Sequence, residues 1–232
     1  MSDFDLYYWP LPFRGQFIRA ILAYAGQDWT EHDSDENAAL MARPPADQPV
    51  PFTGPPVLID RRTGFALSQM PAIAGYLGER FGLTPDTVEA RALVAKTAND
   101  ANDVIDELTQ FGGRQMWSDA SWREFRPRLI GWMALFEEIG QRNGLSISSG
   151  NYLATAEPST ADIIVSTLWS TMGDRFPPLA DLCEEKAPNV WALSERMQNN
   201  PALAALRSRT RDTYGDAYCG GEIEASLRKV MR

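Results

Sequence analysis

The stretch LYYWPLPFRGQFIRAIL, residues 6–22, decides the fold of this chain of 232 residues. An aromatic and apolar run at 4–9 is typical of a buried strand, and Pro10 and Pro12 end it because neither can donate to a sheet ladder. After Gly15 the apolar residues recur along one face of a helix, at Phe17, Ile18, Ile21, Leu22 and Ala25. The stretch therefore predicts a strand, a loop stiffened by proline, and the N-terminus of a helix.

Tyr8 and Arg14, at this junction, are candidates for chemistry. A helix N-terminus offers unpaired N–H groups and the positive end of the helix dipole, and both favour an anionic ligand. A phenol at the end of the strand can donate a hydrogen bond to such a ligand. The structural alternative is a tyrosine that only packs in the core, because any strand–helix unit has such a junction.

Composition and charge argue against several classes of function. The net charge of −9 disfavours binding to nucleic acid or to an anionic membrane, since both require a basic surface. The single histidine, His32, argues against a catalytic triad, and no metal site is predicted. Cys183 and Cys219 form no CxxC motif, which favours a reducing compartment. Without a signal-like N-terminus or a long apolar run, the expected location is the cytoplasm.

The remainder of residues 1–80 predicts a small mixed α/β unit. In order, the expected elements are a strand at 28–32, an irregular proline-rich arm at 33–56, a strand at 56–60, a turn at 61–64, a strand at 65–68 and a helix to about 81. Ser68 is expected to cap this helix, and Pro71 to lie in its first turn, where a missing N–H costs little. Its apolar face holds Ile73, Tyr76, Leu77 and Phe81.

Beyond a linker at 82–85, the pattern predicts helices only. Helical periods occur at 87–112, 121–142, 160–172, 178–185, 188–199 and 201–211. Ser159 and Asp162 stand three residues apart before an apolar run, the spacing of a capping box. A turn at Gly220 and Gly221 precedes a short terminal helix.

In this order, the motifs resemble those of the cytosolic glutathione S-transferase family over nearly the whole chain. The pairs YW and RG at 8–15 are similar to those of the tyrosine-type (mu- and pi-like) members, with two extra residues between the pairs. PPVLID at 55–60 resembles the segment of the family's cis-proline, in the position of Pro56, and SQMPAIAGYLG at 68–78 resembles the helix opening of the glutathione site. The capping box at 159–162 is similar to the family's folding signal.

The resemblance implies a fold of α/β plus all-α class. It divides the chain into a thioredoxin-like glutathione-binding domain at 1–81 and an all-helical bundle domain at 87–232. The ligand site lies between the first strand, the cis-proline loop and the third helix. The resemblance also implies glutathione as co-substrate, a small hydrophobic electrophile as its partner, a homodimer, and a role in detoxification.

Within this resemblance, Tyr8 is the predicted catalytic residue. A free thiol is mostly protonated near neutral pH, and the thiolate is the nucleophile. A phenol that donates a hydrogen bond to the sulfur stabilises the charged form, as does a helix N-terminus. Tyr7 remains the alternative, although strand alternation places it on the opposite face. Residues 5–15 contain no serine or cysteine, so a cysteine-based reductase would lack its nucleophile.

The resemblance also assigns the contacts to glutathione. Gln69 binds the γ-glutamyl end, and Arg14 is a neighbouring cation or a structural partner of the loop. The backbone at Pro55 meets the cysteinyl amide beside Pro56. Asp100 and Asp103 are similar to the acidic residue that reaches the ammonium group of the glutathione in the partner subunit, and the ungapped similarity favours Asp103. The alternative for this acidic run is a solvated helix face.

At two positions the sequence departs from the family pattern. Met70 stands where the family has serine or threonine, so this residue supplies only its backbone N–H to the γ-glutamyl carboxylate. Ser68, on the other side of Gln69, is a second candidate for that contact. Pro55 has no N–H, so one hydrogen bond to the cysteinyl backbone is lost.

The electrophile pocket is expected to be apolar and aromatic. Its candidate residues are Leu11 and Phe13 in the loop, with Met116 and Trp117 after the long helix. Phe111 is interpreted as ordinary core.

The favoured function is a glutathione transferase in which Tyr8 stabilises the thiolate that attacks the electrophile. One alternative is a glutathione-dependent peroxidase or isomerase that uses the same thiolate. Another is a non-catalytic binding module of the same fold, which the departure at Met70 favours.

Overall fold

The computed structural model describes residues 2–231 and places four short strands in one mixed sheet. The strands are β1 (Phe4–Tyr7), β2 (Trp29–His32), β3 (Val57–Asp60) and β4 (Phe65–Ser68), in the spatial order β2-β1-β3-β4. β2 is parallel to β1 because a helix crosses between them, whereas the tight turn after β3 makes β4 antiparallel to β3. The predicted strands are confirmed, although the first ends at Tyr7.

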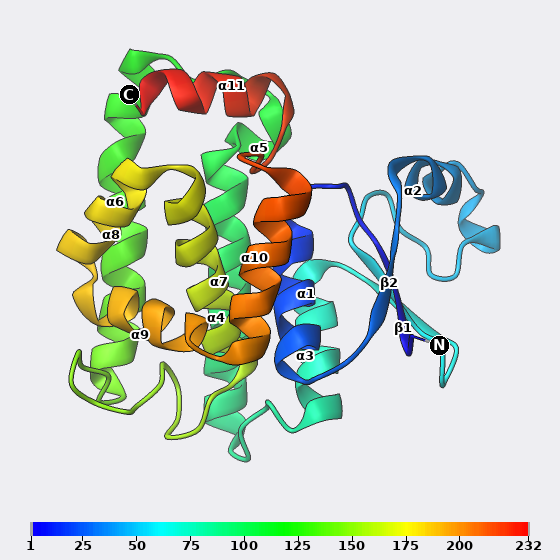
Figure 1. Ribbon diagram of the computed structural model, residues 1–232, viewed down its shortest axis with the longest axis horizontal. Helices are drawn as coiled ribbons and strands as arrows, with labels where there is room; N and C mark the ends of the chain where they lie inside the picture. Colours follow the sequence, from blue (N-terminus) through cyan, green and yellow to red (C-terminus); the bar gives the residue numbers. More distant parts are fainter. Residues whose placement is uncertain (1, 232) are drawn as a thin grey trace.

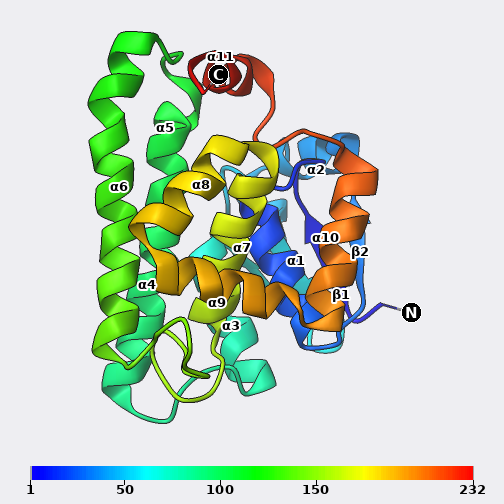
Figure 2. The same cartoon turned by 60° about the vertical axis from the view of Figure 1, so that its left-hand side comes forward.

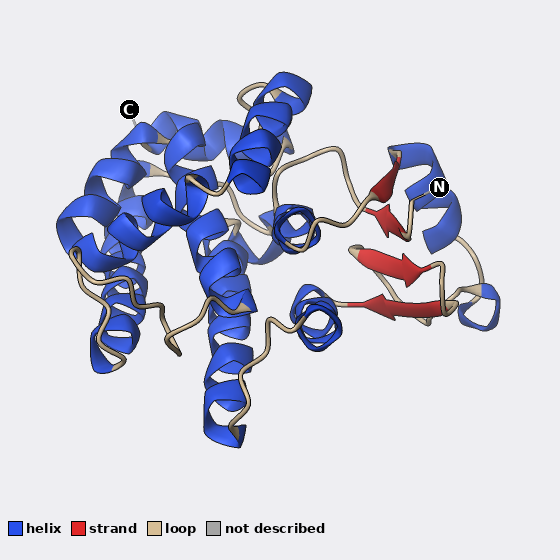
Figure 3. Ribbon diagram, turned by 60° about the horizontal axis from the view of Figure 1, so that its bottom comes forward, coloured by secondary structure: helices blue, strands red, loops and turns tan. Residues whose placement is uncertain are grey.

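Helices cover both faces of this sheet (Figures 1 and 3). α1 (Arg14–Tyr24) and α3 (Met70–Phe81) lie between the sheet and the rest of the chain, and α2 (Ser34–Met41) lies on the far side. The apolar side chains that face inward are fully buried, among them Phe4, Leu6, Ile18, Ile21, Ile73 and Leu77. This buried layer holds β1 and the start of α1 in fixed positions, and both carry candidate site residues.

The arm at 33–56, predicted to be irregular, contains α2 and a short 3₁₀ turn at Pro45–Asp47. Asp33 caps α2 by accepting from the N–H groups of Asp35 and Glu36, and the Glu36 carboxylate accepts from the Asp33 N–H at 3.0 Å. This capping box starts the helix. Only Asn37 and Leu40 of α2 are buried, and a helix that buries so few residues shows almost no apolar periodicity in its sequence.

The start of α3 also differs from the expectation. Ser68 is the last residue of β4 and does not cap the helix. Gln69 is the N-cap residue, with a φ of 73° and no capping hydrogen bond from its side chain. Pro71 lies in the first turn, as predicted. The sharp bend at Gln69 lets the chain pass directly from strand to helix.

From Val88 onward, the described chain forms helices and no strand (Figures 1 and 2). They are α4 (Val88–Leu108), a single turn α5 (Gln110–Gly113), α6 (Asp119–Arg142), α7 (Thr160–Arg175), α8 (Pro177–Lys186), α9 (Pro188–Gln198), α10 (Pro201–Tyr214) and α11 (Gly221–Val230). The predicted helical periods and the terminal helix are confirmed. α7 lies at the centre, where Trp169 is 1% exposed. Among residues 2–231, no helix is both long and apolar enough to cross a membrane.

The helix predicted at 87–112 ends earlier, at Leu108. Four residues, Gln110, Phe111, Gly112 and Gly113, have positive φ and form a left-handed turn. The glycine pair makes this conformation accessible and so breaks the helix. Phe111 was expected in the core, but the turn leaves its side chain 60% exposed.

The predicted capping box at the start of α7 is confirmed and buried. The Asp162 carboxylate accepts from the Ser159 N–H at 2.8 Å and from the Ser159 hydroxyl at 2.7 Å. Its other oxygen accepts from the N–H of Leu153 at 2.7 Å. Asp162 therefore fixes both the start of the central helix and the loop that leads to it.

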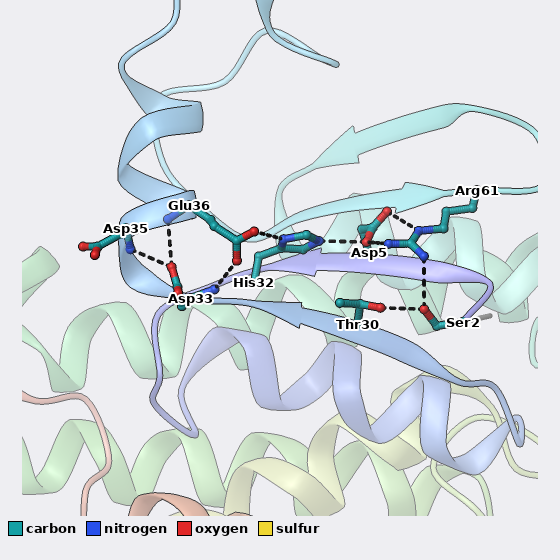
Figure 4. Close-up of polar contacts among 8 residues, drawn as sticks. All are labelled: Ser2, Asp5, Thr30, His32, Asp33, Asp35, Glu36 and Arg61. Atoms are coloured by element: carbon teal, nitrogen blue, oxygen red, sulfur yellow. Dashed lines mark hydrogen bonds and ion pairs between the residues drawn. The ribbon is translucent and has the colours of Figure 1, made fainter.

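His32 joins β1 to α2 on the far face of the sheet (Figure 4). Its Nε2 lies 2.7 Å from Asp5 and its Nδ1 lies 3.1 Å from Glu36. Arg61 donates to both oxygens of Asp5. Burial alone would lower the pKa of His32, but the hydrogen bonds and charges of Asp5 and Glu36 outweigh it and raise that pKa. Both ring nitrogens of His32 contact carboxylates, an arrangement that favours the protonated imidazole and links the sheet to the helix.

We expect this link to make the stability of the protein depend on pH. A raised pKa in the folded state adds stability that is complete below the unfolded value, about 6.5, and is lost as pH rises through the folded value. The free energy of unfolding, measured in urea, should therefore decrease from about pH 6 toward alkaline pH. His32→Gln should remove this part of the dependence. An unchanged dependence in the variant would assign it to other groups.

Candidate active site

Tyr8 lies directly after β1, with its ring against the first turn of α1. Its side chain is 3% exposed, and its Oη accepts from the backbone N–H of Arg14, the first residue of α1, at 2.9 Å. A phenol oxygen that accepts this bond keeps its own proton for donation. Within residues 2–231 no group accepts that proton. The Tyr8 hydroxyl is therefore a hydrogen-bond donor beside the N-terminus of α1.

Burial sets the protonation state of this phenol. Burial raises the pKa of Tyr8 to about 12, against the opposing effects of the Arg14 charge, the Arg14 N–H bond and the Arg19 charge. Tyr8 is thus a neutral hydrogen-bond donor throughout the physiological pH range and not a phenolate base.

Gly15 makes room for the Tyr8 ring. A Cβ added at Gly15 would lie 2.6 Å from Cγ of Tyr8, which is closer than side chains pack. We expect Gly15→Ala to displace the ring, to cost roughly 1–3 kcal/mol of stability as an overpacked site, and to lower kcat/KM at least ~10-fold. Thermal unfolding measures the first effect, and steady-state kinetics with glutathione, the co-substrate that the resemblance implies, measure the second.

Gly131 provides the matched control for this substitution. It lies within α6, and an added Cβ there meets no atom within 4 Å. Gly131→Ala should stabilise the helix by about 0.5–1 kcal/mol and leave kinetics unchanged. Equal kinetics in the two variants would show that the Tyr8 position does not matter.

Tyr7, the alternative phenol, lies on the opposite face of the sheet. Its ring stacks on His32, with centroids 3.9 Å apart. It also lines a hollow with Glu36, Leu40 and Arg43 beneath α2. The two tyrosines therefore point to different sides of β1, and only Tyr8 faces α1.

Three of the residues predicted for the glutathione site meet at one end of the sheet. In the strand register, Val57 pairs with both Tyr7 and Ser68. On each of these three strands, the next residue beyond the paired Tyr7, Val57 and Ser68 belongs to the predicted site. These residues are Tyr8, Pro56 and Gln69, and all three therefore lie at the same end of the sheet. The Pro55–Pro56 peptide bond is cis, and Pro56 is buried.

At the start of α3, the exposed Gln69 lines a cleft between α3 and α4 together with Asn102. Met70 is 1% exposed, so its side chain packs in the core and only its backbone can reach a ligand. The unpaired N–H groups of a helix N-terminus remain available there, except at Pro71. Ser68 is half-buried in β4.

Arg14 links this end of the sheet to α4. Its Nε donates to Oδ1 of Asn102 at 3.1 Å, and its guanidinium forms an ion pair with Asp106. The guanidinium also lies 5.1 Å from the centre of the Phe13 ring. These polar contacts join Arg14 to α4, and its two predicted roles, a neighbouring cation or a structural partner of the loop, stay predictions.

Asp103 is exposed on α4 and is not among the residues that line the α3–α4 cleft. Partial burial and the neighbouring carboxylates of Asp100, Asp106 and Glu107 raise its pKa. Its predicted contact involves a second subunit, so it stays a prediction.

The candidate pocket residues separate into two pairs. The Leu11 side chain lies beside Gly220, 3.3 Å from the position that a Cβ there would take. The Phe13 ring contacts the ring of Tyr218 edge-on, with centroids 5.4 Å apart. Leu11 and Phe13 therefore lie against the C-terminal tail. Trp117 is buried against an aromatic neighbour, Phe125, and its Nε1 donates to the carbonyl of Leu108 at 2.8 Å.

Met116, beside Trp117, is 44% exposed next to the left-handed turn. A Cβ added at Gly113 in that turn would meet both Met116 and Ile223 of α11.

Sequence reasoning missed Asn102, Asp106 and Tyr218 as residues around this site. Asp106 belongs to an acidic run that resembles a solvated helix face, in which the family resemblance points to Asp100 and Asp103 but not to Asp106. Tyr218 stands in a glycine-rich turn with no periodicity to place it.

Comparisons with known proteins show the family of this chain. Residues 93–230, more than half of the chain, match the family model of the glutathione S-transferase C-terminal domain. A probable glutathione S-transferase 6 of Caenorhabditis elegans is 35% identical over 160 residues, covering 66% of this chain and 74% of the relative. The chain belongs to the glutathione S-transferase family. A second relative from that organism, probable glutathione S-transferase 7, is 33% identical over 113 residues, 48% of this chain and 51% of its own.

Solved glutathione S-transferase structures share the fold. NaGST-2 superposes with a TM-score of 0.68 at 26% identity, covering 90% of this chain and 97% of its own. The Pi-class enzyme of Onchocerca volvulus superposes with a TM-score of 0.74 at 17% identity, covering 95% of this chain and 99% of its own. The monomeric Na-GST-3 of Necator americanus superposes with a TM-score of 0.72 at 21% identity, covering 89% of this chain and 96% of its own. The expected class, a thioredoxin-like N-terminal part followed by helices, is thus confirmed.

Proposed function

We propose that this glutathione S-transferase conjugates glutathione to a small hydrophobic electrophile, with Tyr8 stabilising the thiolate. The observation that carries the proposal is the Tyr8 hydroxyl, held by the Arg14 N–H at 2.9 Å with its proton free. The phenol donates to the glutathione sulfur as the thiol proton leaves to solvent. The thiolate then attacks an electrophilic carbon, forming a C–S bond while the leaving group departs with its electron pair.

The energies required are within reach of these groups. Lowering a thiol pKa by about two units requires ~2.7 kcal/mol of preferential stabilisation of the thiolate. One hydrogen bond to a charged group contributes about 1.5–3 kcal/mol, and a helix N-terminus adds about 0.3–1 kcal/mol. Tyr8 and the start of α1 together can therefore account for such a shift.

For glutathione itself, we propose contacts at the end of the sheet where Tyr8, Pro56 and Gln69 lie. Gln69 and the backbone N–H of Met70 bind the γ-glutamyl end, with Ser68 nearby. The carbonyl of Pro55, before Pro56, accepts from the cysteinyl N–H. The buried Met70 side chain supports a weaker contact than the family's hydroxyl would make.

The division at 1–81 and 87–232, a homodimer and a cytoplasmic location belong to the same proposal. In the dimer, Asp103 reaches the glutathione ammonium of the partner subunit. Leu11 and Phe13, with Met116 and Trp117, line the electrophile pocket. The exposed Met116 and the contacts of Leu11 and Phe13 with the tail support an apolar site there.

Calorimetric titration with glutathione, followed by conjugation assays with a chlorodinitrobenzene, tests the proposal. Binding and turnover of the aryl halide are expected. Binding with turnover of only a hydroperoxide would favour the peroxidase. No binding at millimolar glutathione would favour a non-catalytic module, in agreement with Met70.

A further inference from the structure

We propose that Asp106 and Asn102 of α4 are positioning residues for the reaction, because they hold Arg14 and, through it, the hydroxyl of Tyr8. The inference rests on the proposed function of Tyr8. It assigns a role in the chemistry to residues of the helical part that do not themselves reach the sulfur.

The start of α1 has no local cap. Its N-cap residue, Phe13, makes no side-chain hydrogen bond, and the first turn contains no acidic residue. The N–H groups of an uncapped helix start need partners from elsewhere in the fold. Tyr8 supplies one of them by accepting from Arg14. The position of Tyr8 Oη and the position of the first residue of α1 therefore depend on each other.

The side chain of that same residue is anchored to α4. Arg14 Nε donates to Asn102 at 3.1 Å, and Nη2 pairs with Asp106. Asn102 and Asp106 stand four residues apart, so they share one face of α4. Both contacts cross a large sequence separation, 88 and 92 residues, and join the sheet part of the chain to the helical part.

The ion pair of Arg14 and Asp106 is partly exposed to solvent. The Arg14 side chain is 23% exposed and that of Asp106 is 39% exposed. Because the Asp106 carboxylate and the Asn102 amide bind different nitrogens of the planar guanidinium, together they restrict its orientation more than one ion pair would. Without these two contacts, the start of α1 loses its anchor to α4, so the backbone N–H of Arg14 can shift relative to Tyr8 Oη.

Asp106→Ala is the test, with the pKa of the bound glutathione thiol as the readout. We expect this pKa to rise toward the free value and kcat/KM at neutral pH to fall about 5-fold, as for one weakened hydrogen bond. The KM for the electrophile should not change. Asn102→Ala, which removes only the Nε bond, should shift both quantities in the same direction by less. Asp106→Glu should restore part of the loss.

Glu107→Ala is the matched control. Glu107 is the next residue on α4, and it pairs with Arg128 and accepts from Trp132 of α6. Its removal disturbs the same helix on another side and should leave the thiol pKa unchanged. A thiol pKa that is unchanged in Asp106→Ala, or that shifts equally in Glu107→Ala, would overturn the inference.

Tyr8→Phe separates this inference from the proposed function. In the Tyr8→Phe background, Asp106→Ala should cause no further shift of the thiol pKa, because it acts through Tyr8. An equal shift in both backgrounds would overturn the inference and show that the Arg14 charge acts directly. If Tyr8→Phe alone leaves the thiol pKa unchanged, the proposed function of Tyr8 fails first.

Discussion

Replacing Tyr8 by phenylalanine is expected to lower kcat/KM for glutathione conjugation by about 10- to 100-fold at neutral pH. The ring would keep its place against Gly15 and Arg19, so the loss isolates the hydroxyl. A hydrogen bond to a charged group contributes about 1.5–3 kcal/mol, and each 1.36 kcal/mol is tenfold in rate. The affinity for glutathione should change little, because the phenol favours the thiolate over the thiol.

The pH profile makes this prediction sharper. As pH rises above the free thiol pKa, about 8.5, glutathione ionises without help, so the difference between wild type and variant should narrow. Tyr8 itself should not limit the wild-type rate at alkaline pH, because burial raises its pKa to about 12.

Tyr7→Phe is the control for the same substitution on the same strand. Tyr7 stacks on His32 on the far face, so its hydroxyl should have no effect on kcat/KM. A large loss in Tyr7→Phe with none in Tyr8→Phe would reverse the assignment of the two phenols.

The largest loss of stability is expected for Asp162→Ala. The buried carboxylate accepts from two backbone N–H groups, those of Leu153 and Ser159, and from the Ser159 hydroxyl. Its removal leaves buried donors without partners, and each such group costs about 1–3 kcal/mol. We therefore expect unfolding in urea to show a free energy lower by roughly 2–5 kcal/mol.

Asp33→Ala is the comparison, since it removes the same motif at an exposed helix. Asp33 caps α2 with bonds of 3.0 and 2.9 Å to the N–H groups of Asp35 and Glu36, in contact with solvent. Loss of an exposed N-cap costs about 1 kcal/mol. Equal losses in the two variants would show that burial of Asp162 adds nothing.

Most of the fold could be predicted because its elements bury apolar residues at regular spacing. The hairpin at 56–68 and the helices after Val88 are of this kind. α2 was missed because only Asn37 and Leu40 of its residues are buried, although the spacing of Asp33 and Glu36 carried the signal. The left-handed turn that exposes Phe111 depends on consecutive positive φ values, which residue spacing does not reveal.

The positions of Tyr7, Tyr8 and Arg14 could be predicted because these residues follow directly from a strand or a helix end. Strand alternation separated Tyr8 from Tyr7, and the junction placed Arg14 beside Tyr8. The contacts of Arg14 with Asn102 and Asp106 could not be predicted, because they join segments 88 and 92 residues apart. Within the acidic run of α4, only the packed structure distinguishes Asp106, which binds Arg14, from the exposed Asp103.

The most direct test of the central claim is a pH titration of bound glutathione, followed by the ultraviolet absorbance of its thiolate, in wild type and Tyr8→Phe. The account predicts a thiol pKa well below the free value, about 8.5, in the wild type and a return toward that value in the variant. A bound thiol with the same pKa in both proteins would contradict it.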